Sequence, residues 1–409
     1  MQLFTINEPL LPNLTALNWS GTEGSLIPFL PLFLSPGITS ICFESFVLSV
    51  PEFVVASVIT NLPTPCPNLR DIHLRFLPRG LMITAAVSRM VLATNRNALR
   101  KFHVDSSLTK KASAVIYRSQ NLRSLSIVIE GGTLIPSASL PNLISLQIEC
   151  EDWSGVVQLF RRATFGKLKS VKFHIESRSI GDFLEAFKGA ALSSSVQNTL
   201  SVIRLTADWS WKPNYSSLLP FTLLVDLEIR FPCGDNCSGL DDHIIVHLSQ
   251  AMPKLESLKL GDWPCRGFTG GVTTKGFMAL ARNCPNISSL RVHFQVVSLN
   301  NPPIDLGTTD NSGCSASWTG GALRVLQVGE IPVPEGAAPT IALTLLRIFP
   351  QIESIILDDE GWCEVEDIIH RSKRTIDYSS RCHHPTVPRN SLLTLLRSQT
   401  HDQQLERGR

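Results

Sequence analysis

The sequence predicts an α/β fold in which one strand-and-helix unit recurs about thirteen times along the chain. A short phrase with apolar residues at its first, fourth and sixth places returns at a mean spacing of about 28 residues, as in "CPNLRDIHL", "LPNLISLQI" and "MPKLESLKL". Its fifth place, which the phrase leaves free, is polar in eleven of the thirteen copies. Such alternation predicts a strand with one buried face. Seven copies also carry proline two residues before the first apolar place, where proline ends a preceding helix.

The units are placed by their first apolar residues, and the helices between strands by their apolar faces. The first apolar residues are Leu14, Ile38, Leu69, Leu99, Leu122, Leu143, Leu168, Leu200, Leu224, Leu255, Ile287, Leu323 and Ile352. The helix predicted over 241–252 has Ile244, Ile245, Leu248 and Met252 on one face, behind the candidate caps Asp241 and Asp242. The helix predicted over 273–284 repeats that design with Phe277, Leu280 and Ala281.

Strand, loop, helix and proline turn at this period predict a leucine-rich-repeat-like solenoid, with a curved parallel sheet and helices on its convex side. We expect residues 1–370 to form one such solenoid of about thirteen units. Residues 298–321 are rich in Pro, Gly, Ser and Asn and predict a long loop. After His370 the pattern fails, and residues 371–409 hold eight Lys or Arg against three acidic residues, which predicts a mobile basic C-terminal tail.

Composition excludes several classes of protein. A hydrophobic content of 43% and a charged content of 18% exclude a disordered chain, and a net charge of +2 gives no field that would recruit nucleic acid. Ten scattered cysteines favour reduced thiols and hence a cytoplasmic or nuclear protein. The uncharged stretch 25–43 contains Pro28, Pro31 and Pro36, so we expect no membrane span.

The sequence lacks the short motifs of common catalytic sites. It has no P-loop, no G-x-G-x-x-G after a strand, no G-x-S-x-G and no H-E-x-x-H, so we expect no enzyme and no cofactor. Four residues could be written as zinc ligands: Cys233, Cys237, His243 and His247. However, only five residues separate the second cysteine from the first histidine, and both histidines lie on a predicted repeat helix. We therefore predict no metal site.

Polar residues at the third, fifth and seventh places of each unit should project from the concave face of the sheet. From the seventh to the eleventh unit these places hold more basic than acidic residues, the acidic ones being Asp226 and Glu228. The basic residues are Lys172, Arg204, Arg230, Lys259 and Arg291, with His174 and His293 beside them; His73 and His103 take the same places in earlier units. Such a stripe would suit an acidic or phosphorylated protein segment. The alternative interpretation is a solvated sheet face.

Tryptophan recurs just past several strands. Trp153, Trp209, Trp263 and Trp362 follow their unit's first apolar residue by eight to ten positions, three of them directly after aspartate. An exposed tryptophan at this rim would be a binding hot spot, and we count Trp153, Trp209 and Trp263 as candidates. The alternative interpretation is that the rings cover the core while the aspartates bond turn amides.

The phrases "LLPNLTALNWS", "FLPLFLSPGITSI", "LSQAMPKLESLKLGDWPCR" and "GGVTTKGFMALARNCPNISSLRVHFQ" resemble the leucine-rich-repeat region of the large F-box protein family of mushroom-forming fungi, over about residues 10 to 360. The resemblance implies a substrate receptor of a Skp, cullin and F-box ubiquitin ligase, whose repeats face a protein substrate. No F-box is visible, so a Skp adaptor is an expected partner only if an F-box lies upstream. The alternative is a stand-alone binding scaffold with no ligase link.

Overall fold

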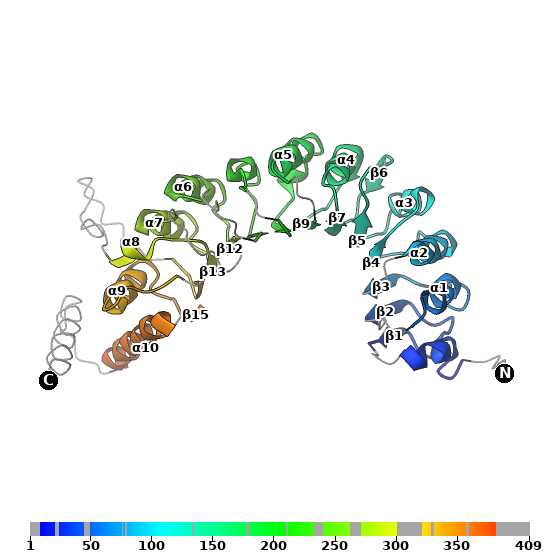
Figure 1. Ribbon diagram of the computed structural model, residues 1–409, viewed down its shortest axis with the longest axis horizontal. Coiled ribbons are helices and arrows are strands. Elements are labelled where there is room, and N and C mark those ends of the chain that lie inside the picture. Colours follow the sequence, from blue (N-terminus) through cyan, green and yellow to red (C-terminus); the bar gives the residue numbers. More distant parts are fainter. Residues whose placement is uncertain are drawn as a thin grey trace.

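The computed structural model describes residues 9–20, 24–44, 50–75, 77, 80–132, 135–176, 180–209, 212–232, 240–261, 271–300, 321–328, 331–356 and 360–381. These residues form an α/β fold around one thirteen-stranded sheet in which every pair of neighbouring strands is parallel. The sheet curves into an arc, with strands on the inner side and helices on the outer side (Figure 1).

Each strand of the large sheet pairs with the strand of the same sheet that comes next along the chain. The strands are β1 (Ala16–Trp19), β2 (Ser40–Glu44), β3 (Asp71–Arg75), β4 (Lys101–Ser107), β5 (Ser124–Ile129), β7 (Ser145–Cys150), β9 (Ser170–Ile175), β10 (Val202–Ala207), β11 (Asp226–Arg230), β12 (Ser257–Leu260), β13 (Ser289–Arg291), β14 (Val325–Gln327) and β15 (Ser354–Ile356). A second, two-stranded sheet joins β6 (Ala138–Leu140) to β8 (Ala163–Phe165).

The α-helices lie along the outer side of the arc, between successive strands except for α10, which follows the last strand (Figure 1). They are α1 (Glu52–Asn61), α2 (Leu81–Ala93), α3 (Lys110–Ile116), α4 (Ser154–Arg162), α5 (Phe183–Ser193), α6 (Asp242–Ala251), α7 (Thr274–Asn283), α8 (Val296–Asn300), α9 (Ala338–Ile348) and α10 (Glu360–Arg381). Three 3₁₀ helices complete the described elements: η1 (Gly24–Phe33), η2 (Val196–Asn198) and η3 (Tyr215–Leu218).

The strand positions and faces predicted from the sequence are confirmed. All thirteen strands begin two residues after the predicted first apolar residue, and neighbouring strands pair these places with one another. Every first apolar residue is buried except Leu14, which is half-buried against the core at the β1 end. In β7 and β9 buried and half-buried residues alternate without a break. One face of the sheet is therefore core and the other faces the inside of the arc.

Two of the predicted helices form where expected. Helix α6 begins after Asp241, whose carboxylate accepts a hydrogen bond from the Ile244 backbone N–H at 2.9 Å. The other candidate cap, Asp242, lies inside α6 and accepts from the backbone N–H groups of Thr273 (2.7 Å) and Gly276 (3.0 Å). One carboxylate thus holds the start of the following helix α7, which couples adjacent units.

The expectation of a helix in every unit is wrong for three connections. In the described residues between β1 and β2, between β5 and β7 and between β10 and β11, a 3₁₀ helix or a short strand replaces the α-helix. Prolines such as Pro31, Pro136 and Pro213 divide each of these connections into runs of eight residues or fewer, whereas the proline-containing connections that form an α-helix keep a proline-free run of ten or more. Proline removes a backbone donor and obstructs the preceding helical turn, so short segments of this composition cannot close an α-helix.

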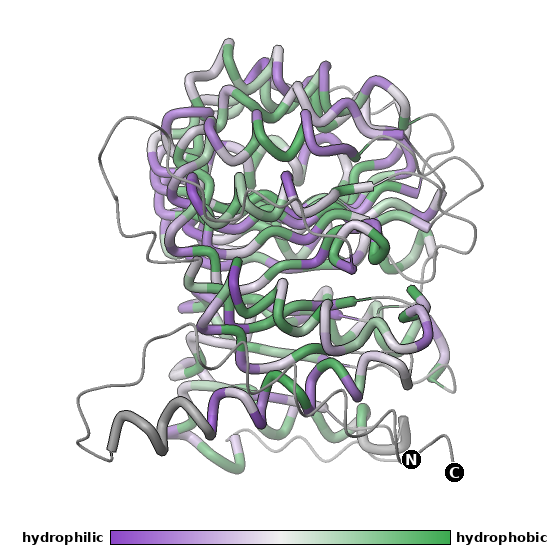
Figure 2. The backbone as a smooth tube through the Cα atoms, turned by 90° about the vertical axis from the view of Figure 1, so that its left-hand side faces the viewer, coloured by the Kyte–Doolittle hydropathy of each residue, from purple (hydrophilic) through white to green (hydrophobic). Residues whose placement is uncertain are grey.

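The core runs along the whole arc. Apolar and polar residues alternate along the backbone and do not divide the molecule into an apolar and a polar half (Figure 2). One part of the core is a group of phenylalanines from three consecutive units, with ring centroids 5.1 to 6.1 Å apart. These are Phe160, Phe173, Phe183, Phe187 and Phe221, all buried. Because each ring contacts the adjacent unit, the packing ties neighbouring units together.

Several sequence expectations lie partly outside the described residues. The predicted loop over 298–321 is described only for its ends, where α8 occupies Val296–Asn300 and Gly321 leads toward β14. Helix α10 continues across the proposed boundary at residue 370 to Arg381, and the rest of the predicted tail lies outside the described residues. No helix in the described part of the chain has the length and apolar character that spanning a bilayer requires.

Candidate functional site

The parallel register places most of the predicted basic residues in one row across the concave face. Lys172, Arg204, Glu228, Lys259 and Arg291 are successive register partners on β9, β10, β11, β12 and β13. Neighbouring strands lie about 4.8 Å apart, so the row is contiguous. His174 and Arg230 belong to the next row, where Thr206 pairs with both.

Glu228 is the centre of this surface and carries three ion pairs. Its carboxylate lies 2.5 Å from Arg230, 3.5 Å from Arg291 and 3.6 Å from Arg204. Glu228 and Arg291 are buried, with 7% and 6% of their surfaces exposed. Removing Glu228 would leave the buried Arg291 guanidinium without this carboxylate, which is costly for a buried charge. The ion pair therefore holds the Glu228 and Arg291 side chains in place within the sheet face.

The second acidic residue of the surface neutralises Arg204. Asp226 accepts hydrogen bonds from Nε and Nη2 of Arg204 at 2.9 and 2.6 Å, and Asp226 itself is mostly covered. This bond, with Glu228 adding to it, raises the pKa of the Arg204 guanidinium. Arg204, Arg230 and Arg291 thus share the carboxylates of Asp226 and Glu228 on this part of the concave face.

Lys172 and Lys259 differ from the arginines of this surface in their pairing. Both are half-buried by their neighbours, and neither forms an ion pair with a described residue. Lys172 lies on β9 beside Arg204, and Lys259 lies on β12 between Glu228 and Arg291. Their ammonium groups are therefore the charges that an incoming partner would meet without breaking an existing pair.

His174 lies among carboxylates at the carboxyl end of β9. Its Nε2 lies 3.6 Å from Asp208 and 4.0 Å from Glu176. Trp209 projects from the same edge with 41% of its surface exposed, and its indole N–H donates to the Glu176 carbonyl at 2.9 Å. This edge offers an exposed, oriented aromatic ring beside the basic row.

The other aromatic and histidine candidates lie differently. Trp153 is half-buried against the core, with its ring centroid 6.3 Å from that of Phe183, and Asp152 accepts from the Ser154 backbone N–H at 3.0 Å. This geometry fits the interpretation that the ring covers the core. His293 is buried. Its ring packs so closely against Gly261 that a Cβ added at Gly261 would lie only 2.7 Å from the His293 Nε2. Trp263 lies outside the described residues, while Trp362 is fully buried.

Nearer the amino end, the same sheet face carries a row of ionisable groups. Cys42, His73 and His103 are register partners on β2, β3 and β4, and the two imidazole centroids are 5.1 Å apart. Burial, and next the charge of His73, lower the pKa of His103 to about 4. Burial and then Arg75 lower the pKa of His73, while burial and Glu44 raise that of the Cys42 thiol.

We predict that His103 makes the protein less stable in mild acid. The unfolded chain binds a proton at His103 near pH 6.5, whereas the folded chain does so only near pH 4. Between these values the unfolded state binds more protons, so stability falls as pH falls from about 6.5 to about 4 and is independent of this group above that window. Positive neighbours, namely His73, Arg75, Lys101 and Lys172, add to the effect.

Melting temperatures at pH 7 and pH 5 test this expectation. His103→Gln should lose less melting temperature between the two values than the unaltered chain. Equal losses in the two proteins would contradict the role of His103.

Two groups of described residues bring three possible metal ligands within 4.8 Å of one another: Cys42, Glu44 and His73, and His174, Glu176 and Asp208. Three protein ligands leave one position of a tetrahedral zinc site to water. For the cysteine and histidine motif considered from the sequence, His243 and His247 lie on α6 with ring centroids 4.1 Å apart, and Cys233 and Cys237 lie outside the described residues. The absence of a metal site stays a prediction.

Sequence reasoning missed a second basic cluster. Arg70, Arg100 and Arg123 occupy the second place in the third, fourth and fifth units, and with three asparagines they line one hollow. The signal was present as Leu-Arg in three consecutive copies of the phrase. It was missed because only the places expected on the concave face were compared.

Comparison with known proteins does not assign this chain to a group. No protein-family model matches it, and no curated protein is similar enough to count as a relative.

Proposed function

We propose that the chain is a leucine-rich-repeat-like solenoid that binds a protein partner on its concave face, between β9 and β13. The supporting observation is the register row in which Lys172 and Lys259, two cations without a described acidic partner, lie among arginines that are paired with Asp226 and Glu228. These ion pairs hold their side chains in place before any partner arrives, so docking would lose little side-chain entropy there. The two lysines select an acidic or phosphorylated segment.

The fold supports this proposal because it supplies a long inner face. Thirteen parallel strands line the inner side of the arc (Figure 1), and most residues at the third and fifth places of the units on them are polar. An extended concave surface of this kind is what repeat proteins use to hold other proteins. We do not expect an enzyme acting alone, since the surface acts by charge and shape.

The resemblance to F-box proteins leads us to propose the partner's role as well. The bound protein would be a substrate presented to a Skp, cullin and F-box ubiquitin ligase, and the surface between β9 and β13 would be its receptor. A stand-alone scaffold would use the same surface. Co-purification of the product of the complete gene with a Skp adaptor favours the receptor, and partner binding without any adaptor favours the scaffold.

A photo-crosslinking side chain at position 206 tests where the partner binds. Thr206 lies on β10 between His174 and Arg230 in the register, and replacing it leaves every basic residue of the surface in place. We expect a discrete crosslinked product in extracts of the cells that express the chain. The matched control carries the same group at Gln250, which is exposed on α6 at the outer side of the arc.

The two positions give opposite results under this proposal. Position 206 should form the adduct and position 250 should not, and an acidic competitor peptide should reduce the yield at position 206. If position 250 yields the same adduct as position 206, or position 206 yields none, the concave face is not the binding surface.

A further inference from the structure

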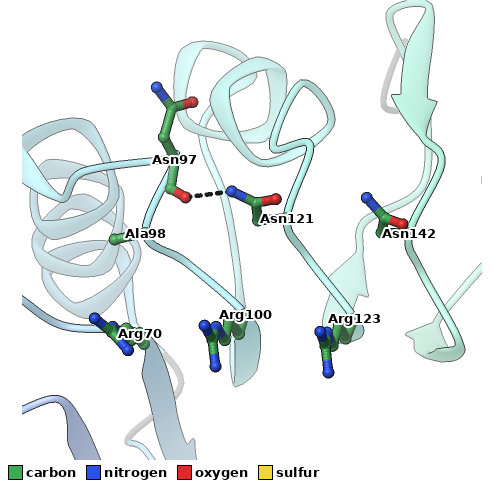
Figure 3. A pocket seen from close by; sticks show the side chains of 7 residues that line it. All are labelled: Arg70, Asn97, Ala98, Arg100, Asn121, Arg123 and Asn142. Atoms are coloured by element: carbon green, nitrogen blue, oxygen red, sulfur yellow. Dashed lines mark hydrogen bonds between the residues drawn. The ribbon is translucent and has the colours of Figure 1, made fainter.

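Three arginines lie side by side at the amino-terminal edge of the sheet. Arg70, Arg100 and Arg123 directly precede β3, β4 and β5. The backbone N–H of Arg100 donates to the Arg70 carbonyl, and that of Arg123 donates to the Arg100 carbonyl, both at 2.7 Å. These bonds hold the three residues one strand apart, so their side chains form a row on neighbouring loops (Figure 3).

The row borders a hollow whose remaining lining residues are mostly asparagines. Its volume is about 310 Å³, and its remaining lining residues are Asn97, Ala98, Asn121 and Asn142. Asn121 donates one side-chain N–H to the Asn97 carbonyl at 2.7 Å, as Figure 3 shows, and Asn142 donates to the Gln120 carbonyl at 2.9 Å. Each of these amides keeps a second N–H for a ligand. Every charged residue that lines the hollow is an arginine.

No described acidic side chain pairs with these arginines. The adjacent Asp71 instead lies 3.7 Å from Lys101. The same place in the twelfth and thirteenth units shows the contrast, because Arg324 there has Glu353 as its neighbour at 4.0 Å. Like charges on adjacent strands repel, so a bound anion would relieve the repulsion among these three guanidinium groups, which have no acidic partner among the described residues.

We propose that Arg70, Arg100 and Arg123 form a binding site for the phosphate groups of a multiply phosphorylated ligand. Planar guanidinium groups donate paired hydrogen bonds to phosphate oxygens, and neighbouring ones can share a phosphate group. The asparagine amides add neutral donors on the other side of the hollow. This site lies on the third to fifth units at the sheet edge and is separate from the concave surface between β9 and β13, so neither depends on the other.

Calorimetric titration of the full chain with inorganic triphosphate tests the proposal. We expect binding that weakens as salt is added, because exposed charges are screened. Arg100→Gln, which removes the central charge, should weaken binding about tenfold, and Arg100→Lys should fall between the two because it keeps charge but loses the fork. Arg324→Gln is the matched control at the same place of another unit and should bind as the unaltered chain does.

A second titration with a synthetic peptide carrying three phosphoserines identifies the source of the phosphate. Tighter, Arg100-dependent binding of the peptide assigns the site to a phosphorylated protein segment, and tighter binding of triphosphate assigns it to a small polyphosphate. The proposal is overturned if neither probe binds, or if Arg324→Gln weakens binding as much as Arg100→Gln. Arg100 and Arg324 are exposed, so we expect their variants to keep the melting temperature of the unaltered chain, which excludes unfolding as the cause of weaker binding.

Discussion

Replacing Leu258 with aspartate is expected to unfold the units around β12, at a cost of about 4 kcal/mol or more. Leu258 is fully buried, and its register partners Leu227 and Leu290 are also fully buried. The substitution removes apolar contacts on both sides and puts a carboxylate among leucines with no cation to pair with it. Most of the cost comes from that unpaired charge.

Hydrogen exchange measures this effect where it occurs. Units of a repeat fold are stabilised by their neighbours, so the amides of β11, β12 and β13 should lose protection first. Leu258→Met keeps the volume and should cost less than about 1.5 kcal/mol. Lys259→Asp places the same carboxylate one residue later on the opposite face, where it meets the like charge of its register partner Glu228, and should cost about 1 kcal/mol or less. If Leu258→Asp and Lys259→Asp were equally stable, the assignment of faces would be wrong.

The strand positions could be predicted because they depend on local pattern. A strand with one buried face must place apolar residues at alternate positions, so the thirteen phrases carried their own register, and Leu224, Leu255 and Ile287 marked where β11, β12 and β13 begin. The helices α6 and α7 were equally visible, because Asp241 and the apolar faces follow helical spacing. The missing helices were also encoded, in prolines such as Pro136 and Pro213, which the repeat pattern outweighed.

The ion pairs within the candidate surface could not be predicted from the same pattern. The sequence placed Glu228 opposite a basic excess, but its contacts with Arg204, Arg230 and Arg291 depend on side-chain conformations across three strands. Burial of Arg291 likewise depends on its neighbours and not on its own unit. The sequence count favoured the arginines as binding residues, whereas the ion pairs leave Lys172 and Lys259 as the cations of the row without a described carboxylate partner.

Reversing the charge of Lys172 and Lys259 together should have the largest effect on partner binding. Reversing Arg204, as the sequence alone would suggest, places a carboxylate beside Asp226 and Glu228 and so mixes binding with local repulsion. The two lysines make no ion pair with a described residue, so their reversal breaks no existing pair. Because Lys259 is the register partner of Glu228, the melting temperature of the double variant is measured as well, to separate local repulsion from lost binding.

The most direct test of a concave, charge-selecting surface is therefore the affinity of Lys172→Glu/Lys259→Glu for the protein that crosslinks at position 206. The matched control is Lys110→Glu/Lys275→Glu, which makes the same change in net charge at exposed positions of α3 and α7 on the outer side of the arc. We expect the concave double variant to bind about tenfold or more weakly and the control to bind as the unaltered chain does. Equal affinity of the two double variants would contradict a binding surface between β9 and β13.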